Sequence, residues 1–478
     1  MDTLDTSLAQ ETELFSYIEE MQDPLSTVRV HVAGIRDLNR DARTYNLPNE
    51  TLSAIFEAGL IETPFLEDMI RIPRMRTFEY RAWGSESPPF EILVSSVSRR
   101  WRSVALQTPR LWTVLNIDVE NPTHDHHDLY LHRSKTCSLD ITLSNCYQQE
   151  ELPSDLVSEA NPDLMGHMYR LIPHVGRWRK FIMLNSWIES PSTVFSALAH
   201  SRAPALETLV LDFRGSKGPI LDLFSGGAPR LSCVELVGVC LRPPLEVVKY
   251  AKLHHHTRSE TRLTYAEMNQ LIRPMRSLIH LQLDSDIVAE FANYPLIELP
   301  SLLSLDIRIR GSVGALRFLN LPAIKILTIY GFSPEIIQAL TQHHCLYPRV
   351  QVLKFVADIH CLDNTPGDTV VDLILLFPNV VDITFRGTDP IPILKALHNR
   401  RPTDKLLWPH LSAITISIAV RSNVGHRRQI WFEVVKVVCN YLELGQPLPS
   451  IKLSSEIVND VSPRLQQRLR EQVAFVEF

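Results

Sequence analysis

Several features that would indicate an enzyme or a secreted protein are missing from this chain of 478 residues. Glycine is scarce, with 17 residues against 32 prolines, and neither a glycine-rich phosphate-binding pattern nor a Gly-x-Ser-x-Gly motif occurs. The seven cysteines are scattered and odd in number, and no Cys-x-x-Cys pair is present. We therefore expect reduced thiols, as in the cytoplasm and/or nucleus, with no disulfide framework and no cysteine nucleophile.

Charge and hydropathy argue against two classes of partner. The formal net charge is −6, whereas nucleic-acid binding needs a basic face. No apolar run is long enough to cross a bilayer, and the acidic start Met1–Asp5 lacks the basic and apolar regions of a secretory signal. We expect neither nucleic acid nor membrane as a partner. The length, with an ordinary 45% of hydrophobic residues, predicts two or more folded units.

Histidine and acidic clusters do not predict a metal site or a catalytic site. The clusters His124–His127 and His254–His256 have no second ligand pair at a fixed helical spacing, so we interpret them as surface or loop residues. Asp284 and Asp286 follow an expected strand and are interpreted as solvated loop residues. We therefore expect no metal, no cofactor and no catalytic residue.

Two amphipathic helices are predicted after an N-terminal arm over residues 1–43, in which Thr12–Met21 is a possible helix. The first covers residues 47–59, with Pro48 in a first turn that tolerates proline. Its apolar positions share one face: Leu52, Ile55, Phe56 and Gly59. The second is expected over Phe90–Leu106 and ends before Pro109. Its apolar side carries Leu93, Val97, Trp101, Val104 and Ala105.

The order of the motifs in these helices is more specific than their amphipathic pattern. Leu47-Pro48 is followed by Leu52-x-x-Ile55-Phe56, then by Val97-Ser98-Arg99-Arg100-Trp101-Arg102-x-Val104-Ala105 and Thr108-Pro109-x-Leu111-Trp112. Over about 70 residues this order resembles F-box proteins, especially the large family of mushroom-forming (basidiomycete) fungi. The resemblance implies a small helical module, residues 44–115, that binds a Skp-type adaptor and through it the cullin of a ubiquitin ligase.

The resemblance also implies which residues contact the adaptor. They come from the first helix, its entry and the start of the second motif: Leu47, Pro48, Leu52, Ile55, Phe56, Val97, Arg100 and Trp101. Trp101 can equally be a core residue of the module, since tryptophan is usually well buried. The segment 61–89 is longer than the compact motif needs and is interpreted as an insertion.

A repeated pattern, apolar-x-x-apolar-x-apolar, runs along residues 116–420. It occurs at Trp178/Phe181/Met183, Leu206/Leu209/Leu211, Leu231/Val234/Leu236, Leu278/Leu281/Leu283, Leu302/Leu305/Ile307, Ile324/Leu327/Ile329, Val350/Leu353/Phe355, Val380/Ile383/Phe385 and Leu411/Ile414/Ile416. Most intervals are roughly 22 to 31 residues, and Val248/Ala251/Leu253 is a weak candidate within the one long interval. The spacing predicts an α/β leucine-rich-repeat solenoid, or horseshoe, of degenerate form, because Arg214 replaces an expected Asn or Cys.

The segment before the repeats is expected to start the stack of strands, and the segment after them is expected to cover its end. Leu139–Leu143 reads as a strand that begins the stack, and Glu150–Asp163 as an exposed loop. Thr264-x-x-Glu267 and Asp389-Pro390 are typical of helix starts within it. Residues 421–478, with a helix over Gln429–Leu444, are predicted to form a C-terminal helical cap.

Together these patterns predict a non-enzymatic substrate-recognition subunit of a cullin-RING (SCF-type) ubiquitin ligase. Its unknown protein target would bind exposed strand positions and loops, for example Glu207, Glu235, Asp306, Arg308, Lys325 and Lys354. Two alternatives stay open. One is a leucine-rich-repeat interaction scaffold without ligase association, whose N-terminal helices only cap the repeats. The other is an enzyme, such as a doubly wound parallel-sheet protein, although that fold usually carries a glycine-rich turn.

Overall fold

The computed structural model describes residues 47–60, 88–119, 124–144, 162–187, 195–214, 220–238, 241–254, 263–284, 295–308, 319–330, 347–356, 367–398, 407–417, 424–460, 463, 466–467 and 475–477. These residues form two compact units. The first unit includes the helices before Thr113 together with Tyr130–Cys137, and the second contains Val114–Leu129 and Ser138–Phe478. The possible helix Thr12–Met21 and most of the insertion 61–89 lie outside the described residues.

The first unit consists of short helices. They are α2 (Asn49–Ala58), α4 (Phe90–Val97), α5 (Arg99–Gln107) and the 3-10 helix η2 (Pro109–Trp112). The single helix expected over Phe90–Leu106 is wrong, because the chain breaks at Ser98, which has an extended backbone with φ −157° and ψ 165°. The Ser98 hydroxyl accepts a hydrogen bond from the Trp101 backbone N–H at 3.1 Å and so caps α5.

The core of the first unit lies between these helices and the segment Tyr130–Cys137. Its buried apolar side chains are Leu52, Phe56, Val94, Val104, Ala105, Leu111, Trp112, Tyr130 and Leu131. The indole N–H of Trp112 donates to the Ala105 carbonyl at 2.9 Å, and Tyr130 meets the Trp112 ring edge-on at 5.1 Å. The Tyr130 hydroxyl donates to the Glu91 carboxylate at 2.5 Å. Burial and this carboxylate raise the pKa of Tyr130, so the hydroxyl remains a donor.

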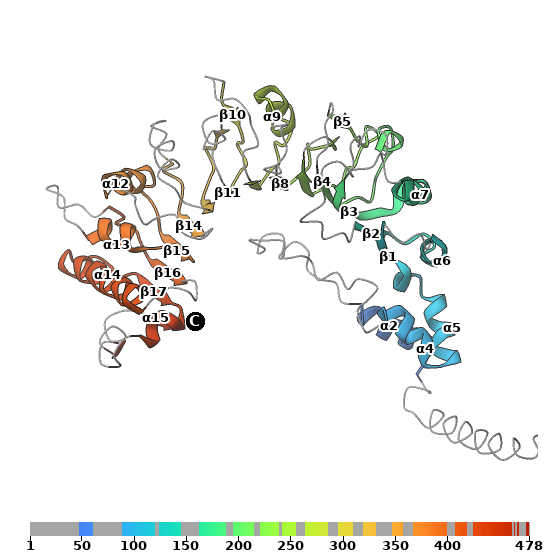
Figure 1. Ribbon diagram of the computed structural model, residues 1–478, viewed down its shortest axis with the longest axis horizontal. Coiled ribbons are helices and arrows are strands. Elements are labelled where there is room, and N and C mark those ends of the chain that lie inside the picture. The colour runs from blue at the N-terminus through green and yellow to red at the C-terminus, as the bar shows by residue number, and fades with distance from the viewer. Residues whose placement is uncertain are drawn as a thin grey trace, which may run out of the picture. The chain divides into compact units, whose positions relative to one another are not determined.

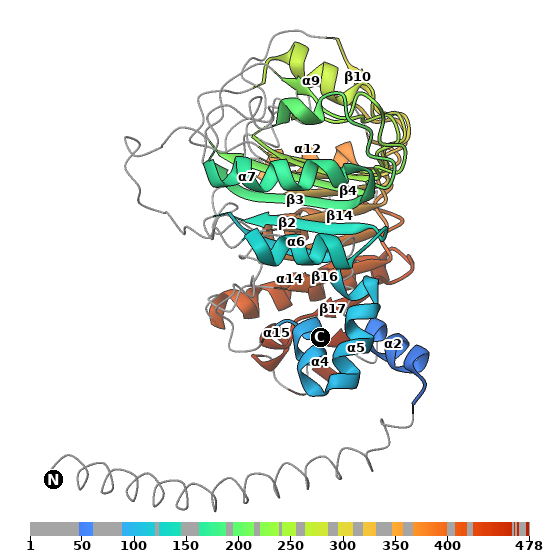
Figure 2. The ribbon, with the colours of Figure 1, turned by 90° about the vertical axis from the view of Figure 1, so that its right-hand side faces the viewer.

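The second unit has a mixed α/β fold built on one sheet of fourteen parallel strands. The strands are β1 (Val114–Asp118), β2 (Leu139–Ser144), β3 (Trp178–Trp187), β4 (Thr208–Arg214), β6 (Cys233–Val237), β8 (Tyr250–His254), β9 (His280–Asp284), β11 (Ser304–Arg308), β13 (Ile326–Tyr330), β14 (Val352–Val356), β15 (Asp382–Arg386), β16 (Ala413–Ser417), β17 (Ser450–Leu453) and β18 (Phe475–Glu477). They pair in chain order (Figures 1 and 2). Four two-residue strands form two further pairs: β5 (Leu221–Asp222) with β7 (Leu241–Arg242), and β10 (Ile297–Glu298) with β12 (Leu319–Asn320).

Helices connect many of these strands. They include α6 (His124–Arg133), α7 (Pro162–Leu171), α9 (Tyr265–Ile272), α12 (Gly367–Leu376), α13 (Ile391–His398), α14 (Val424–Glu443), α15 (Ser455–Asn459) and the 3-10 helices η4 (Ile172–Arg177) and η5 (Ser196–Leu198). Figure 1 shows α7, α9, α12 and α13 on the same side of the sheet. Two predicted helix starts are confirmed, because Thr264 and Glu267 form a capping box and the Asp389 carboxylate accepts the Ile391 N–H at 2.9 Å.

The predicted triplets supply the buried positions of the strands. Their middle residues stand opposite one another in register: Phe181, Leu209, Val234, Ala251, Leu281, Leu305, Leu327, Leu353, Ile383 and Ile414. Each is at most 2% exposed. The weak candidate Val248/Ala251/Leu253 is confirmed as the triplet of β8, between β6 and β9. Because each of these ten strands buries its triplet against its neighbours, the core runs along the sheet.

Both ends of the sheet differ from expectation. The helical cap predicted over residues 421–478 is only partly right, because β17 and β18 extend the sheet there. The predicted helix Gln429–Leu444 is confirmed as α14, which starts earlier, at Val424. At the other end, β1 precedes the predicted first strand and pairs with β2. The predicted loop Glu150–Asp163 is described only at its end, where Pro162 starts α7.

Candidate functional site

The three predicted adaptor contacts within α2 lie on two different faces of this helix. Leu52 and Phe56 belong to the core, at 0% and 1% exposure, whereas Ile55 is 48% exposed. Gly59 lies on the core side, because an added Cβ would come within 2.4 Å of the Phe90 ring. The single apolar face expected for Leu52, Ile55, Phe56 and Gly59 is therefore wrong for Ile55.

Arg100 and Trp101 connect α5 to α2. The Trp101 ring is half-buried, with its centre 5.0 Å from that of Phe56. The Arg100 guanidinium donates to the Asn49 side-chain oxygen, at 3.1 Å from Nη2, and also to the Leu47 carbonyl. Leu47 itself is half-buried. These contacts position the entry of α2 against the start of α5.

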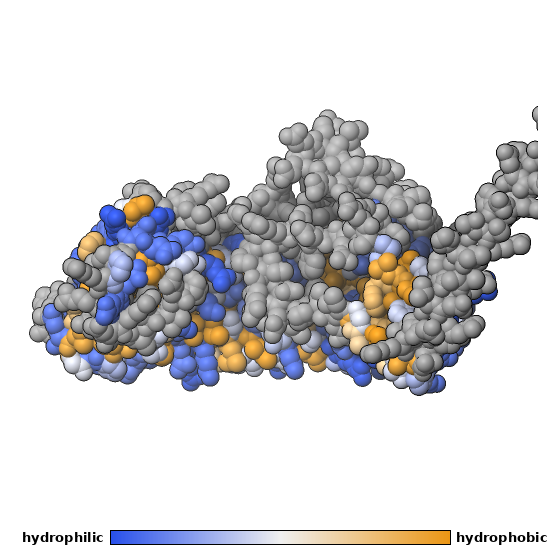
Figure 3. All heavy atoms as spheres, turned by 90° about the horizontal axis from the view of Figure 1, so that it is seen from below, coloured by the Kyte–Doolittle hydropathy of each residue, from blue (hydrophilic) through white to orange (hydrophobic). Residues whose placement is uncertain are grey.

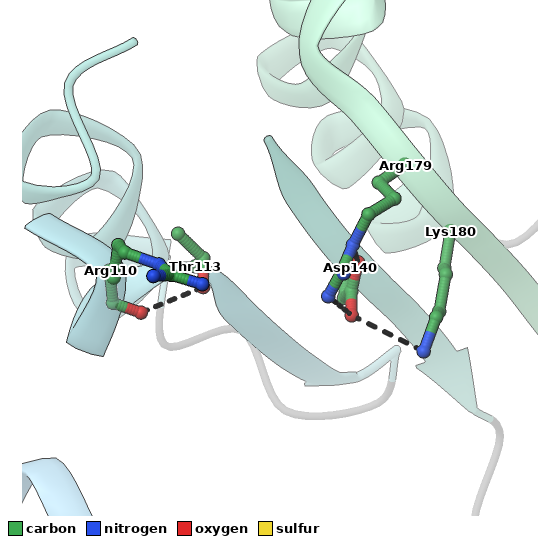
Figure 4. A network of polar contacts seen from close by, with 5 residues as sticks. All are labelled: Arg110, Thr113, Asp140, Arg179 and Lys180. Carbon is green, nitrogen blue, oxygen red and sulfur yellow. Dashed lines mark hydrogen bonds and ion pairs between the residues drawn. The ribbon is translucent and has the colours of Figure 1, made fainter. Parts of the chain in front are cut away.

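Two further polar contacts join α2 to the end of this unit. The Ser53 and Thr108 hydroxyls lie 2.8 Å apart, and the Thr108 hydroxyl also donates to the Val104 carbonyl at 2.8 Å. Arg110 forms an ion pair with Glu57 at 3.1 Å. Figure 4 shows the backbone of Arg110 at η2, where its carbonyl accepts from the Thr113 hydroxyl at 2.8 Å. The motif Thr108-Pro109-x-Leu111-Trp112 thus packs against the helix that carries the first motif.

Only some of the residues predicted to contact an adaptor are apolar and exposed. Pro48 is exposed, and Val97 is the most exposed large apolar side chain of α4, at 57%. Leu93 and Leu106, which were not among the predicted contacts, are also exposed. In the space-filling view of Figure 3, apolar residues reach the surface at several places, including the right-hand part of the view. On the solvent side of α2, the exposed uncharged residues Thr51, Ala54, Ile55 and Ala58 recur at helical spacing, with the exposed Glu50 one turn before Ala54. Such a strip suits a helix-in-groove contact.

The predicted target-binding residues belong to the second unit, and four of them share one face of its sheet. This second face carries the strand residues that alternate with the buried triplets. Its central row follows the register through Glu235, Lys252, Gln282, Asp306, Thr328, Lys354, Thr384, Thr415 and Lys452. Arg308 lies two residues beyond Asp306 on β11. Glu207 and Lys325 instead lie just before β4 and β13, in the connections that lead into these strands. The expected exposure is wrong for Glu235 and Asp306, which are buried at 3% and 6%.

Glu207 and Lys325 take part in a backbone ladder just before the strands. The Glu207 N–H donates to the Arg179 carbonyl at 2.8 Å, and the Lys325 N–H donates to the Leu303 carbonyl at 2.9 Å. The Lys325 carbonyl in turn accepts the Gln351 N–H at 2.9 Å. The described contacts of these two residues therefore give them a structural role at the entry to the sheet.

Charges on the first strands of the second face are paired. Asp140 accepts from both Nε and Nη2 of Arg179, at 2.8 and 2.7 Å, and lies 3.7 Å from the Lys180 ammonium (Figure 4). Glu235, which is 3% exposed, pairs with Lys252 at 2.5 Å. Burial, with a smaller contribution from Glu235, raises the pKa of Cys233 to about 12, so this thiol is protonated and a poor nucleophile.

Charges on the middle strands are partly buried and coupled. His280 lies 4.0 Å from Asp306. Burial raises the pKa of the Asp306 carboxyl, and His280, a hydrogen bond with Thr328, and the cations Lys354 and Arg308 oppose that shift. The guanidinium of Arg308 lies 4.7 Å from the Tyr330 ring centre, in a cation–π contact.

The histidine clusters give no metal centre in the described part of the chain. His127 on α6 is buried, and its ring meets that of His167 at 5.4 Å in an edge-on contact. Among the residues with described positions, no group of three or more His, Cys, Asp or Glu side chains could hold a metal ion. The described helices are also too short or too polar to cross a bilayer.

Comparison with known proteins gives only a distant likeness. No protein-family model matches the chain, and no curated protein matches it. A chain of the solved structure titled "Crystal structure of TLR13-ssRNA13 complex" is similar at 12% identity and a TM-score of 0.31. The likeness covers 59% of this chain and 41% of that chain, so this chain spans less than half of its length. At this TM-score the likeness supports no argument about fold or function.

Proposed function

We propose that this chain is the substrate-recognition subunit of a cullin-RING (SCF-type) ubiquitin ligase. In this proposal the first unit is an F-box-like module that binds a Skp-type adaptor and through it a cullin. The second unit is a degenerate leucine-rich-repeat solenoid that binds a target protein. The chain itself performs no chemistry, and the partner enzymes of the ligase transfer ubiquitin in the cytoplasm and/or nucleus.

One observation carries the proposal: the two halves of the sequence motif meet in one helical unit. Arg100 of the second half binds the Leu47 carbonyl of the first, and Trp101 contacts Phe56. The residues 61–89, which interrupt the motif, do not prevent these contacts. A motif whose separated parts pack together is better explained by a module than by unrelated amphipathic helices.

Burial distinguishes the motif residues that stabilise the helical unit from those that can contact a partner. Leu52 and Phe56 are buried, so they stabilise α2 and leave the outward side chains to meet a partner. Pro48, Ile55 and Val97 are exposed apolar residues, and we assign the adaptor contact to them. Arg100 and Trp101 position α2 and add contact at the edge of this surface.

Adaptor capture by the full-length chain tests the proposal. The double variant I55E/V97E places two charges on the assigned surface and should abolish capture of a purified Skp-type adaptor. The matched control is L375E, which changes a 47% exposed leucine on α12 in the second unit. It should capture the adaptor as the unchanged chain does. Capture by I55E/V97E at the unchanged level contradicts the assigned surface, and no capture by the intact chain contradicts the ligase role.

The second candidate function is a leucine-rich-repeat scaffold without ligase association. It is favoured by the sheet, whose fourteen strands offer a long surface for protein contacts. In that case deletion of residues 46–112 would leave target binding unchanged, and the intact chain would capture no adaptor.

A further inference from the structure

From β6 to β17, exposure increases along the second face of the sheet. Glu235 on β6 and Asp306 on β11 are buried, at 3% and 6% exposure. Lys354 on β14 is half-buried, and Arg386 on β15 and Lys452 on β17 are exposed. Between β6 and β17, solvent and partners therefore reach this face most freely over β14–β17.

The pairing of charges changes along the same direction. On the earlier strands, Glu235 pairs with Lys252. Over β14–β17 the cations are Lys354, Arg386 and Lys452, here called the three-cation patch. The side chains of these three form no hydrogen bond or ion pair with the side chain or backbone of any described residue, although Lys354 contributes to the electrostatic field at Asp306 and His280. The patch thus has positive charge that these intramolecular contacts do not neutralise.

The register fixes the spacing of the patch. Lys354 stands opposite Thr384, Thr384 opposite Thr415, and Thr415 opposite Lys452. Since neighbouring strands lie about 4.8 Å apart, the Lys354 and Lys452 backbones are about 14 Å apart. An extended peptide rises about 3.3 Å per residue, so about five residues cross this span.

The groups between the cations suit an extended peptide. The hydroxyls of Thr384 and Thr415 lie in the row between Lys354 and Lys452 and can donate to carboxylates or carbonyls. Asp382 is the one acidic residue among the described second-face positions of β14–β17, and its buried Oδ1 has no hydrogen-bond partner. The three cations of the patch outnumber this one carboxylate, so the described second-face positions of β14–β17 carry a net positive charge that suits an acidic segment.

We propose that the three-cation patch binds an acidic, extended segment of the target protein. The inference rests on the proposed function of the second unit as a target receptor and names the chemistry of its target. Two carboxylate side chains about four residues apart pair with Lys354 and Lys452, and Arg386 binds a third. Thr384 and Thr415 orient the segment between them.

Peptide binding to the purified full-length chain tests this proposal. The probe is a fluorescein-labelled peptide of neutral residues with glutamate at the first, third and fifth positions, measured by fluorescence anisotropy. We expect binding that weakens as salt rises to about 0.15 M, because exposed charges are screened. Charge neutralisation in K354M, R386M or K452M should each weaken binding about two- to fivefold, as for exposed ion pairs. The peptide with lysine at the same positions should not bind.

Three controls make the result decisive. K395M neutralises an exposed lysine on α13, outside the patch, and should leave the affinity unchanged. An equal loss in K395M and K354M would overturn the proposal, because net charge alone would then explain binding. Tighter binding of a single-stranded RNA, or binding only of a phosphoserine version of the probe, would also overturn it.

Adaptor capture separates this inference from the proposed function. The patch variants should capture the Skp-type adaptor as the unchanged chain does, since the assigned adaptor surface belongs to the first unit. If the unchanged chain binds the acidic peptide but captures no adaptor, the ligase role is contradicted and the acidic-segment site is not. Normal adaptor capture with no peptide binding contradicts the acidic-segment site alone.

Discussion

The ring of Trp101 on α5 packs against that of Phe56 on α2, with centres 5.0 Å apart and planes inclined by 56°. Trp101 belongs to the second half of the interrupted motif and Phe56 to the first. This tilted aromatic contact therefore joins two segments that residues 61–89 separate in the sequence. Aromatic pairs in this geometry add to the stabilisation from their burial.

The first prediction concerns the two sides of α2. F56A removes a ring that is 1% exposed and should destabilise the first unit by about 3 to 5 kcal/mol. I55A shortens a side chain that is 48% exposed and should change stability by about 0.5 kcal/mol or less. Hydrogen exchange of the α2 amides measures the opening of this unit separately from the sheet. Equal opening in both variants would contradict the assignment of faces.

The second prediction concerns a turn after β6. Gly238 has φ +69°, and an added Cβ would lie 2.2 Å from the Phe213 carbonyl oxygen. G238A should therefore cost about 1 to 3 kcal/mol or more, since both the backbone conformation and the close approach oppose it. G227A tests the conformation alone, because Gly227 has φ +96° and open space around the added Cβ.

The control for this turn is G176A. Gly176 has no atom within 4 Å of an added Cβ, and its φ lies outside the left-handed region. Denaturant unfolding should rank the three variants with G238A least stable, then G227A, then G176A. A G238A protein as stable as the G176A protein would show that the turn relaxes without cost.

The third prediction concerns the buried ion pair on the second face. Glu235 is 3% exposed and pairs with Lys252 at 2.5 Å. K252M leaves the Glu235 charge buried without this partner and should cost about 3 to 5 kcal/mol. The double variant E235M/K252M removes both charges and should recover most of the loss. Additive effects of E235M and K252M in denaturant unfolding would mean that the two charges are not coupled.

The fourth prediction concerns pH. His398 on α13 lies 2.5 Å from the Glu433 carboxylate on α14, and Lys436 lies 3.1 Å from it. Burial alone would raise the pKa of Glu433, but hydrogen bonds from His398 and Lys436 outweigh it and hold the pKa below its ordinary value. The charged form is thus favoured by folding.

The sign of the pH effect follows from this lowered pKa. Glu433 adds stability above its unfolded pKa of about 4.3, and this stability is lost as the pH falls through the lower folded value. E433Q should therefore be less stable than the unchanged chain at about pH 7, with a difference that shrinks on acidification below about pH 4. Unfolding free energies over this range check the prediction, and a constant difference would contradict it.

The strands of the sheet could be predicted because their triplets have a fixed spacing. Two of the missed strands also carry the signal: Trp112-x-x-Leu115-x-Ile117 leads into β1, and Leu448-x-x-Ile451-x-Leu453 leads into β17. Both lie at the edges of helical segments, so their apolar residues were interpreted as helix or cap. The apolar-x-x-apolar-x-apolar pattern by itself, without the interpretation of the adjacent segments as helical, predicts both strands.

The helical unit was harder to predict in detail. Helical periodicity places Leu52, Ile55 and Phe56 within one broad face, and only the packing of α4 and α5 turns Ile55 outward. The break at Ser98 left no mark on the apolar pattern, although serine is a favoured cap residue. The sequence pattern also does not fix the first residue of each strand. It therefore does not show that Glu207 and Lys325 lie just before β4 and β13.

Assembly of purified components tests the central claim most directly. The chain, a Skp-type adaptor and a cullin are mixed in pairs and all together, and the complexes are separated by size-exclusion chromatography. The account predicts that the chain co-elutes with the cullin only when the adaptor is present, and that I55E/V97E abolishes this three-component complex. Separate elution of the intact, folded chain and the adaptor would contradict it.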